Sequence, residues 1–476
     1  MKQPLVVAIL AAGQGTRFRS GRAKVLHSAG GRTLIAHVVG AAKQLSPKSI
    51  FVIVGHQADN VVASLQGFAR DGLSFIIQQE QKGTGHALLA GRRQLEKASP
   101  LLVVLSGDTP LLSPQTLRQF IRSHRQSRAA ATVLTAEMED PSGYGRIIRS
   151  AGLPGGGAIA AIVEHKSASE PQRAIREVNT GIYCFDSRKL FAALKRVRPD
   201  PITKELYLTD VVDILAGQGE RVAAYKAADS SEVLGINNRA ELAHADRLLR
   251  ARKARELMLA GVTVLAPETV RIDPEVEVCP DTEIEPGVIL SGRTRIGKNC
   301  RVGAYSVVTD SELADDVTIR PCCVIAESRI AKAATIGPFA HLRPEADIGP
   351  QARIGNFVEV KKSRVGRDSR AAHLTYLGDA IIGDNVNVGA GTITCNYDGE
   401  KKNNTVIEDN VFVGSGTELV APVRVGRNAY VAAGSTITDD VPTDALAIAR
   451  GRQVIKTGWV RRRKKEAAAC KQPAGN

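Results

Sequence analysis

Aromatic side chains are scarce in this sequence. They make up 4% of its 476 residues, with a single tryptophan, so aliphatic packing must form most of the core. The 44 glycines fit a chain with many tight turns. No apolar run approaches the roughly 18 residues of a membrane-spanning helix, and we therefore expect no membrane insertion.

The cysteines lack any pattern that would indicate a disulfide framework or a zinc site. There are seven of them, an odd number, and they are scattered without Cys-x-x-Cys spacing. We interpret them as free thiols in a reducing compartment, which predicts a cytoplasmic protein.

Acidic residues are fewer than basic residues. The chain has 49 Asp and Glu and 64 Lys and Arg, which gives a net charge of +15. This balance favours anionic partners such as phosphorylated metabolites, nucleotides or nucleic acid. The densest basic run, residues 461–465, lies in a tail of residues 456–476 and has no interleaved aromatic residue. We therefore expect a solvated, partly disordered tail and no nucleic-acid partner.

The chain is too long for one core, and its pattern changes near residue 260. Over residues 1–237, strand-like apolar runs alternate with helical patterns, which predicts an α/β domain with a mostly parallel sheet. Residues 238–260 are predicted to form a linker helix, capped by Asn237 or Asn238 and followed by Gly261. Its charged middle favours a solvated connector over a buried helix.

Residues 261–455 follow a different period. Aliphatic residues recur every six positions in three runs, over residues 284–308, 330–360 and 407–437, often followed by glycine. A six-residue period is typical of hexapeptide β-helices, in which the repeated aliphatic side chain points inward. The phase breaks at residues 375–383 and 395–404, where we expect loops to leave the coil.

A glycine-rich loop follows the first apolar run. Gly13-Gln-Gly-Thr-Arg17 matches neither Gly-x-Gly-x-x-Gly nor the Walker A motif. Its backbone N–H groups, with Arg17 and Lys24, suit a phosphate chain, although an ordinary strand-to-helix loop is also possible. Asp108 ends a later buried run, where a carboxylate can bind Mg²⁺ or simply stabilise a turn.

The order of short motifs carries more information than any one of them. The strings LAAGxGTR…KVLH, QxGTGHA, GD, GYGR, VEHK, NTG and GINNR are followed by RPEADIG, IGNFVEVKKS, AAHLTYLGDA, NVGAGTITCNYDG and AIARG. In sequence and spacing they resemble the bacterial family of bifunctional N-acetylglucosamine-1-phosphate uridylyltransferases/glucosamine-1-phosphate acetyltransferases, over residues 5 to about 460. The resemblance implies a Rossmann-like nucleotidyltransferase domain, a left-handed parallel β-helix and a homotrimer.

The resemblance also implies a uridylyltransferase site. The residues implied to bind nucleotide and sugar are Leu10, Ala11, Ala12, Gly13, Arg17, Lys24, Gln78, Gly83, Thr84, Ser106, Gly107, Gly145, Glu164 and Asn179, with Asp108 and Asn237 as Mg²⁺ ligands. From the residues alone, Thr84 can also cap the next helix. Two positions depart from the family pattern: Ala23 often is proline, which suggests a less rigid loop, and Ser106 is tyrosine in some members.

An acetyltransferase site is implied in the second half. His373 would be the general base, because a group titrating near neutral pH suits removal of the amine proton. The residues implied to bind the sugar phosphate are Arg343, Lys361, Tyr376 and Asn387, and those implied to bind acetyl-CoA are Ala390, Asn396, Tyr397, Ser415, Ala433 and Arg450. We further expect Glu359 to orient His373, and Lys402 and the tail to meet coenzyme A phosphates of a neighbouring subunit.

The implied enzyme acetylates glucosamine 1-phosphate with acetyl-CoA and then joins N-acetylglucosamine 1-phosphate to UTP, making UDP-N-acetylglucosamine for cell-envelope sugars. Two alternatives remain open from the sequence. One is a sugar-1-phosphate nucleotidyltransferase whose β-helix only forms the trimer. The other is a regulatory or scaffolding protein, which would be expected to lack Asp108, Asn237 or His373.

Overall fold

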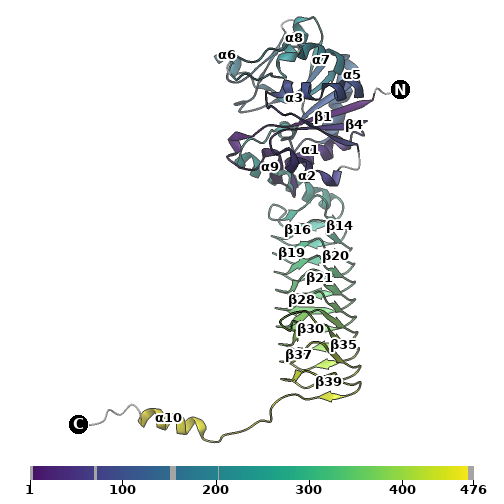
Figure 1. The fold of residues 1–476 in the computed structure, drawn as a ribbon, viewed down its shortest axis with the longest axis vertical. Helices are drawn as coiled ribbons and strands as arrows, with labels where there is room; N and C mark the ends of the chain where they lie inside the picture. The colour runs from purple at the N-terminus through teal and green to yellow at the C-terminus, as the bar shows by residue number, and fades with distance from the viewer. Residues whose placement is uncertain (1–3, 69–71, 151–156, 202, 470–476) are drawn as a thin grey trace, which may run out of the picture. The chain divides into compact units, whose positions relative to one another are not determined.

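The computed structural model describes residues 4–68, 72–150, 157–201 and 203–469. They form two compact units (Figure 1). The first comprises residues 1–256 and 270–275, and the second comprises residues 257–269 and 276–476.

The first unit is built on a nine-stranded sheet. Seven strands follow the order β11-β7-β10-β6-β1-β4-β5, and β8 and β9 extend it beside β10. Their bounds are β1 Leu5–Ala11, β4 Ser49–Val54, β5 Leu73–Ile77, β6 Leu101–Ser106, β7 Ala131–Glu137, β8 Arg146–Arg149, β9 Ile159–Val163, β10 Glu177–Asp186 and β11 Val222–Lys226. Strand β1 runs parallel to β4 and β6, whereas β10 is antiparallel to β6 and β7.

Helices cover both faces of this sheet, which explains the continuous apolar run of the first strand. Leu5, Val7 and Ile9 pack into one core cluster, while Val6 and Ala8 pack into the other. Helices α1 (Leu34–Lys43), α2 (Ala58–Ser64) and α5 (Pro114–Ser127) contribute to the first cluster, and α3 (Thr84–Ala90), α4 (Arg92–Ala98), α7 (Ser187–Leu194) and α8 (Asp210–Gly217) contribute to the second. The short α6 spans Glu170–Arg173.

The predicted linker helix is α9, Arg239–Leu259, and it is buried on one side. Asn238 caps it, since its Oδ1 accepts a hydrogen bond of 2.9 Å from the N–H of Glu241. Ala245 packs in a small cluster with Phe18 and Leu34, so the helix is solvated only on its other side. The charged middle of the helix predicted a solvated connector, and this prediction missed the buried side because few apolar residues of the helix form it.

The second unit is a parallel β-helix of short strands, from β12 (Thr263–Val264) to β41 (Leu446–Ala447), in sheets of eleven, ten and nine strands. Successive coils stack in register: Ile336 lies beside Ile354 in one sheet, and Leu342 lies beside Val360 in the next. All four side chains are buried. The six-residue period therefore does mark the inward-facing positions, as predicted.

One of the two predicted loops is real and the other is wrong. Residues 395–404 include a small excursion from the coil in which Tyr397 pairs with Lys402. Residues 375–383 instead stay in the coil as strands β31 (Tyr376–Gly378) and β32 (Ala380–Ile382). Asp379, with φ of 48°, turns the corner between them, and this tighter corner shortens the spacing of inward residues without a loop.

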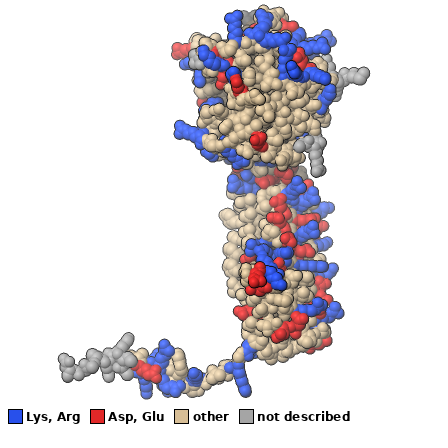
Figure 2. Space-filling model, viewed as in Figure 1, with Lys and Arg blue, Asp and Glu red and all other residues tan. Residues whose placement is uncertain are grey.

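An apolar stripe runs along one corner of the β-helix. We use the name apolar stripe for Tyr305, Phe339, Phe357 and Leu374, whose exposed fractions are 69%, 51%, 57% and 63%. The rings of Phe339 and Phe357 stack with centroids 5.4 Å apart. In Figure 2 charged side chains of both signs line one side of the β-helix, and the surface next to them is largely uncharged.

Helix α10, Trp459–Ala469, lies within the tail, and its described side chains are exposed.

The six cysteines of the described residues are free thiols. Among the described residues, no helix combines the length and the apolar character that crossing a membrane requires.

Candidate active sites

The first unit contains a cavity of about 670 Å³ at the carboxyl ends of its central strands. Ligands of α/β sheets bind at this edge because the loops there converge. All but two of the sixteen residues implied for the uridylyltransferase site line it: Leu10, Ala11, Ala12, Gly13, Arg17, Lys24, Gln78, Gly83, Thr84, Ser106, Asp108, Glu164, Asn179 and Asn237. Motifs that lie far apart in the sequence thus meet in one cavity.

Gly107 and Gly145, the two exceptions, support its wall. The N–H of Gly107 donates to Leu10 O at 2.9 Å, and a Cβ at this position would lie only 2.9 Å from that oxygen. Gly145 O accepts from the N–H of Asn179 at 2.8 Å. Both glycines therefore hold neighbouring backbones close together.

Two cations meet two oxygen-bearing side chains at one end of the cavity. The ammonium of Lys24 pairs with the carboxylate of Asp108 and lies 3.3 Å from Asn237 Oδ1. Arg17 donates to the same Asn237 oxygen at 3.0 Å. Burial acts to raise the pKa of the Asp108 carboxyl, but Lys24 and Ser106 outweigh it and hold that pKa below its ordinary value.

The oxygens of Asp108 and Asn237 contact the same ammonium, so they converge on a point where a cation is stabilised. Carboxylate and amide oxygens are hard ligands that suit Mg²⁺, which commonly completes its shell with substrate phosphates and water. No cluster of three or more His, Cys, Asp or Glu side chains able to hold a metal occurs among the described residues. The two oxygens therefore fit a metal that shares its coordination shell with a phosphate.

Gly15 makes the position of Lys24 possible. Its φ of 64° lies in the left-handed region, and a Cβ there would lie 2.7 Å from the Cβ of Lys24. A side chain at residue 15 would therefore both strain the backbone and displace the ammonium from Asp108.

Both departures from the family pattern have partners in the structure. Ser106 donates to Asp108 Oδ1 at 2.7 Å. Ala23 has an N–H group that proline would lack, and this group donates to Gln57 Oε1 at 3.0 Å. A hydrogen bond thus tethers the loop at the position where the family often has proline.

The second motif, QxGTGHA, forms another part of the cavity wall. The amide nitrogen of Gln78 lies 3.2 Å from Gly83 O and 3.0 Å from His86 Nδ1, which fixes the side chain. Helix α3 begins at Thr84 with Gly83 as its N-cap, so the expectation that Thr84 caps the helix is wrong. Its hydroxyl oxygen accepts from the N–H of Leu208 at 3.0 Å instead.

Four polar side chains lie in the same cavity as two hydrogen-bonded pairs. Asn179 donates to the Tyr183 hydroxyl at 2.8 Å, and its Oδ1 accepts from the N–H of Gly181 at 3.1 Å. Thr209 donates to Glu164 Oε1 at 3.4 Å. Burial raises the pKa of Glu164, so its carboxyl group binds a proton more readily than an ordinary glutamate does.

The implied acetyltransferase residues follow the stacking of the β-helix. Asn356, His373, Ala390, Ser415 and Ala433 occupy one corner of successive coils. The N–H groups one residue further along donate back by one coil, from Leu374 to Asn356, Gly391 to His373, Gly416 to Ala390 and Gly434 to Ser415, at 3.1, 3.4, 2.7 and 2.8 Å. Arg450 joins this column by donating to Ala433 O at 2.7 Å.

The imidazole of His373 has a different partner from the one predicted. Its Nδ1 lies 2.6 Å from Asn356 Oδ1. Glu359 instead accepts from Arg343 at 2.8 Å. The expectation that Glu359 orients His373 is therefore wrong, and it failed because Glu359 belongs to the next side of the coil, whereas Asn356 pairs directly with His373.

Basic side chains gather on that next side. Arg343 and Lys361 lie on adjacent coils, and hydrogen bonding and repulsion from Lys402 lower the pKa of Lys361. Asn396 is buried and donates to Asp379 Oδ2 at 2.6 Å. The cluster of Arg343, Lys361 and Lys402 carries only positive charge, which suits a phosphate group.

Tyr376, Tyr397 and Asn387 have separate surroundings. Tyr376 pairs in register with Glu359, and Tyr397 donates to Gly399 O at 2.5 Å in the excursion. Asn387 lies between Arg370 and Phe412 on the outer face of its sheet, outside the column that contains His373.

Comparison with known proteins identifies the family. The MobA-like NTP transferase domain family matches residues 7–264. The bacterial transferase hexapeptide repeat and the hexapeptide repeat of succinyl-transferase match residues 404–439 and 293–325. The chain is 50% identical over 462 residues to the "Bifunctional protein GlmU" of Koribacter versatilis (strain Ellin345), covering 97% of each chain.

The chain belongs to the bifunctional GlmU family. GlmU proteins of Solibacter usitatus (strain Ellin6076) and Geobacillus sp. (strain WCH70) are 49% and 47% identical to it, covering 98% of each chain in the first case and 95% of this chain and 97% of the relative in the second. These matches confirm the resemblance seen in the motifs and the fold class, a Rossmann-like nucleotidyltransferase followed by a left-handed β-helix. The protein is thus a bifunctional transferase, acting on a nucleoside triphosphate and on acetyl-CoA.

Several cavity residues escaped the sequence analysis of this GlmU-family chain. Glu205, Tyr207, Leu208 and Thr209 line the cavity because Leu206 pairs with the QxGTGHA loop, donating to Lys82 O and accepting from the N–H of Gly85, each at 2.8 Å. They form no motif, so only this pairing reveals them. Tyr183 lies in the same strand as Asn179, and its spacing from that motif was the one signal available.

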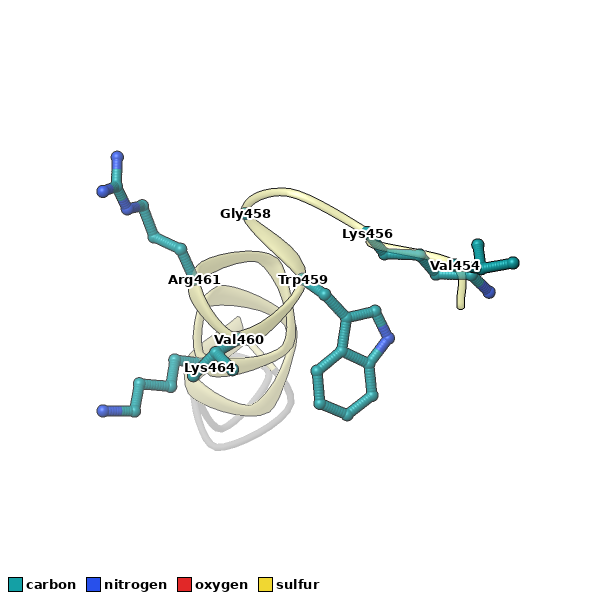
Figure 3. Close-up of a pocket in the computed structure, with 7 residues that line it drawn as sticks. All are labelled: Val454, Lys456, Gly458, Trp459, Val460, Arg461 and Lys464. Carbon is teal, nitrogen blue, oxygen red and sulfur yellow. The ribbon is translucent and has the colours of Figure 1, made fainter. Parts of the chain in front are cut away.

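The tail also borders a concave surface. A depression of about 890 Å³ is lined by Val454, Lys456, Gly458, Trp459, Val460, Arg461 and Lys464 (Figure 3). Figure 3 shows the indole of Trp459 on one side of the helix and Arg461 and Lys464 pointing away from it. These exposed side chains do not converge, so the depression is not a formed site within one chain.

Proposed function

We propose that the cavity of the first unit transfers a uridylyl group from UTP to N-acetylglucosamine 1-phosphate, and that the β-helix transfers an acetyl group from acetyl-CoA to glucosamine 1-phosphate. The observation that carries this assignment is the convergence of Arg17, Lys24, Asp108 and Asn237 with the sugar-side residues Glu164 and Asn179 in one cavity. The cations and oxygen ligands suit the diphosphate of a UDP-sugar, and the polar residues in the same cavity suit its sugar.

In the first reaction the sugar phosphate oxygen attacks the α-phosphorus of UTP, the bond to the bridging oxygen breaks, and pyrophosphate leaves. Arg17, Lys24 and the backbone N–H groups of residues 11–15 hold the phosphates and stabilise the charge that grows on the leaving group. Asp108 and Asn237 would hold Mg²⁺, which when bound neutralises phosphate oxygens. No protein nucleophile is required.

Two groups of cavity residues would select the substrates. Since the amide nitrogen of Gln78 is held by Gly83 and His86, its Oε1 is the group suited to accept from the uracil N–H. Glu164 and Asn179 offer an acceptor and an amide to sugar hydroxyl and acetamido groups. Gly83 and Thr84 shape the uracil side, and Gly145 supports the sugar side.

In the second reaction the amine of glucosamine 1-phosphate attacks the thioester carbon. The C–S bond breaks, His373 takes the amine proton, and the proton passes to the departing coenzyme A thiolate. Arg343 and Lys361 would hold the sugar phosphate, and Lys402, which adjoins Lys361, would join them rather than meet coenzyme A phosphates. Tyr376, Asn387, Asn396 and Tyr397 would lie around the sugar and thioester. The corner residues Ala390, Ser415 and Ala433, with Arg450, would line the coenzyme A site.

We infer that the chain forms a homotrimer. Exposed apolar patches on soluble proteins mark interfaces, and the apolar stripe is such a patch. Leu374 belongs to it and directly follows His373, so a copy covering the stripe would also border the imidazole. The basic tail could then reach coenzyme A phosphates of a neighbouring subunit, and a cytoplasmic location stays a prediction from the free thiols.

The test is incubation of the chain with glucosamine 1-phosphate, acetyl-CoA, UTP and Mg²⁺, with detection of UDP-N-acetylglucosamine and pyrophosphate. His373→Ala should abolish acetyl transfer and leave uridylyl transfer intact, and Asp108→Ala should do the reverse. Acetyl transfer that survives His373→Ala would refute the base assignment. Full Mg²⁺-dependent uridylyl transfer by Asp108→Ala would refute the metal assignment.

A further inference from the structure

The contact between Asn356 and His373 is built by the register of the β-helix. Asn356 ends strand β27 (Arg353–Asn356), and His373 ends strand β30 (Arg370–His373), one coil further. The two residues are paired in the parallel ladder, so their side chains leave the same corner of adjacent coils. The short distance of 2.6 Å between Asn356 Oδ1 and His373 Nδ1 follows from this stacking.

An amide oxygen can only accept a hydrogen bond, so this contact requires a proton on Nδ1. In a neutral imidazole the proton is on one nitrogen only, and the other nitrogen keeps its lone pair. A proton held on Nδ1 thus leaves Nε2 as the basic nitrogen. The partner of one ring nitrogen decides which nitrogen can act as a base.

Neither Glu359 nor the hydrogen bonds to the His373 backbone orient the imidazole ring. Glu359 is committed to Arg343, at 2.8 Å, and pairs in register with Tyr376, not with His373. The carbonyl of His373 itself accepts from Gly391 and Thr375, at 3.4 and 2.7 Å, which fixes the backbone but not the ring. Of these contacts, the one to Asn356 alone reaches an imidazole nitrogen.

We propose that Asn356 is a positioning residue for acetyl transfer, holding His373 in the tautomer whose Nε2 faces the substrate amine. This inference rests on the proposed role of His373 as general base. Asn356 would act through the imidazole and would not touch the reacting atoms. An imidazole without this acceptor also populates the tautomer that carries its proton on Nε2, which cannot remove a proton from the amine.

A matched pair of variants tests the acceptor. Asn356→Leu keeps nearly the same shape and removes the acceptor, and we expect kcat for acetyl transfer to fall about 10- to 100-fold with both KM values little changed, a loss typical of residues that orient an active group. Asn356→Asp keeps an acceptor and should restore most of kcat. Uridylyl transfer by the same chain should not change, which controls for folding.

Glu359→Gln provides the contrasting variant. Because Glu359 pairs with Arg343, we expect a higher KM for glucosamine 1-phosphate and little change in kcat. If Glu359→Gln lowered kcat as much as Asn356→Leu, or if Asn356→Leu kept full kcat, the inference would be wrong.

Neutron diffraction on crystals of the deuterated full-length protein, grown at a pH where the imidazole is neutral, reads the tautomer directly. Deuterium on Nδ1 and a bare Nε2 are expected. Deuterium on Nε2, or the Asn356 amide nitrogen turned toward the ring, would overturn the inference. Survival of acetyl transfer in His373→Ala would instead remove the proposed function, so the two failures are distinguishable.

Discussion

The ammonium group of Lys24 forms an ion pair with the carboxylate of Asp108. Asn237 Oδ1 lies 3.3 Å from the same ammonium, so a side-chain cation occupies the point on which the two proposed metal ligands converge. Mg²⁺ and Lys24 would therefore compete for the same oxygens. We expect the ammonium of Lys24 to shift from Asp108 toward the substrate phosphates when a metal binds there.

Replacing Lys24 with methionine should separate these two roles. Without the ammonium, the free protein should bind Mn²⁺, used as a probe for Mg²⁺, several times more tightly by calorimetry. Uridylyl transfer should nevertheless slow by about 100-fold or more, because a group that stabilises transition-state charge is lost. Lys189→Met, which removes a half-buried lysine paired with Glu220 outside the cavity, is the control and should change neither the Mn²⁺ affinity nor the rate of uridylyl transfer. Equal or weaker Mn²⁺ binding by Lys24→Met would contradict the competition.

The raised pKa of Glu164 predicts an acid-sensitive sugar site. Burial disfavours the carboxylate, so Glu164 takes up a proton at a higher pH than an ordinary glutamate as the pH falls. The protonated group accepts fewer hydrogen bonds, and the KM for N-acetylglucosamine 1-phosphate should rise toward acid pH while the KM for UTP changes less. In Glu164→Gln the KM for the sugar phosphate should be raised at all pH values and should vary less with pH. A wild-type KM for the sugar phosphate that is flat through the acid range would exclude this role.

The inward-facing aliphatic residues of the β-helix could be predicted because one short strand per six residues imposes their period. The cavity residues could be placed because parallel strands end at one edge of a sheet, where Gly13 and Asp108 both follow β-strands. Asn356 could not be assigned, because only the register of adjacent coils brings it to His373. Tyr207 was missed for a similar reason, since its loop reaches the cavity by pairing with residues 82–85, which no local pattern reveals.

The apolar stripe predicts how the trimer can be broken. Phe357→Glu places a charge in the middle of the stripe, and burying that charge against another copy would be unfavourable. Size-exclusion chromatography with light scattering should show loss of the trimer, with a fall in acetyl transfer but not in uridylyl transfer. Ile381→Glu is the control. Ile381 is also exposed, at 52%, but it lies outside the apolar stripe, on the outer face of a sheet beside Arg364. Dissociation by both variants, or by neither, would argue against the stripe as the interface.

Stability of the β-helix should depend on its inward-facing positions far more than on their neighbours. Leu342 is fully buried, stacked between Ile325 and Val360 of adjacent coils, and Leu342→Ala should lower the free energy of unfolding of this unit by about 2–5 kcal/mol through lost burial and the cavity left behind. His341, the preceding residue of the same strand, points outward and is exposed. His341→Ala should change the free energy of unfolding by less than about 0.5 kcal/mol. Thermal inactivation of each activity reports on each unit separately. Acetyl transfer by Leu342→Ala should be lost at a lower temperature than in the wild type, while uridylyl transfer should be lost at the same temperature as in the wild type. Loss of both activities at one lowered temperature would mean that the two units unfold together.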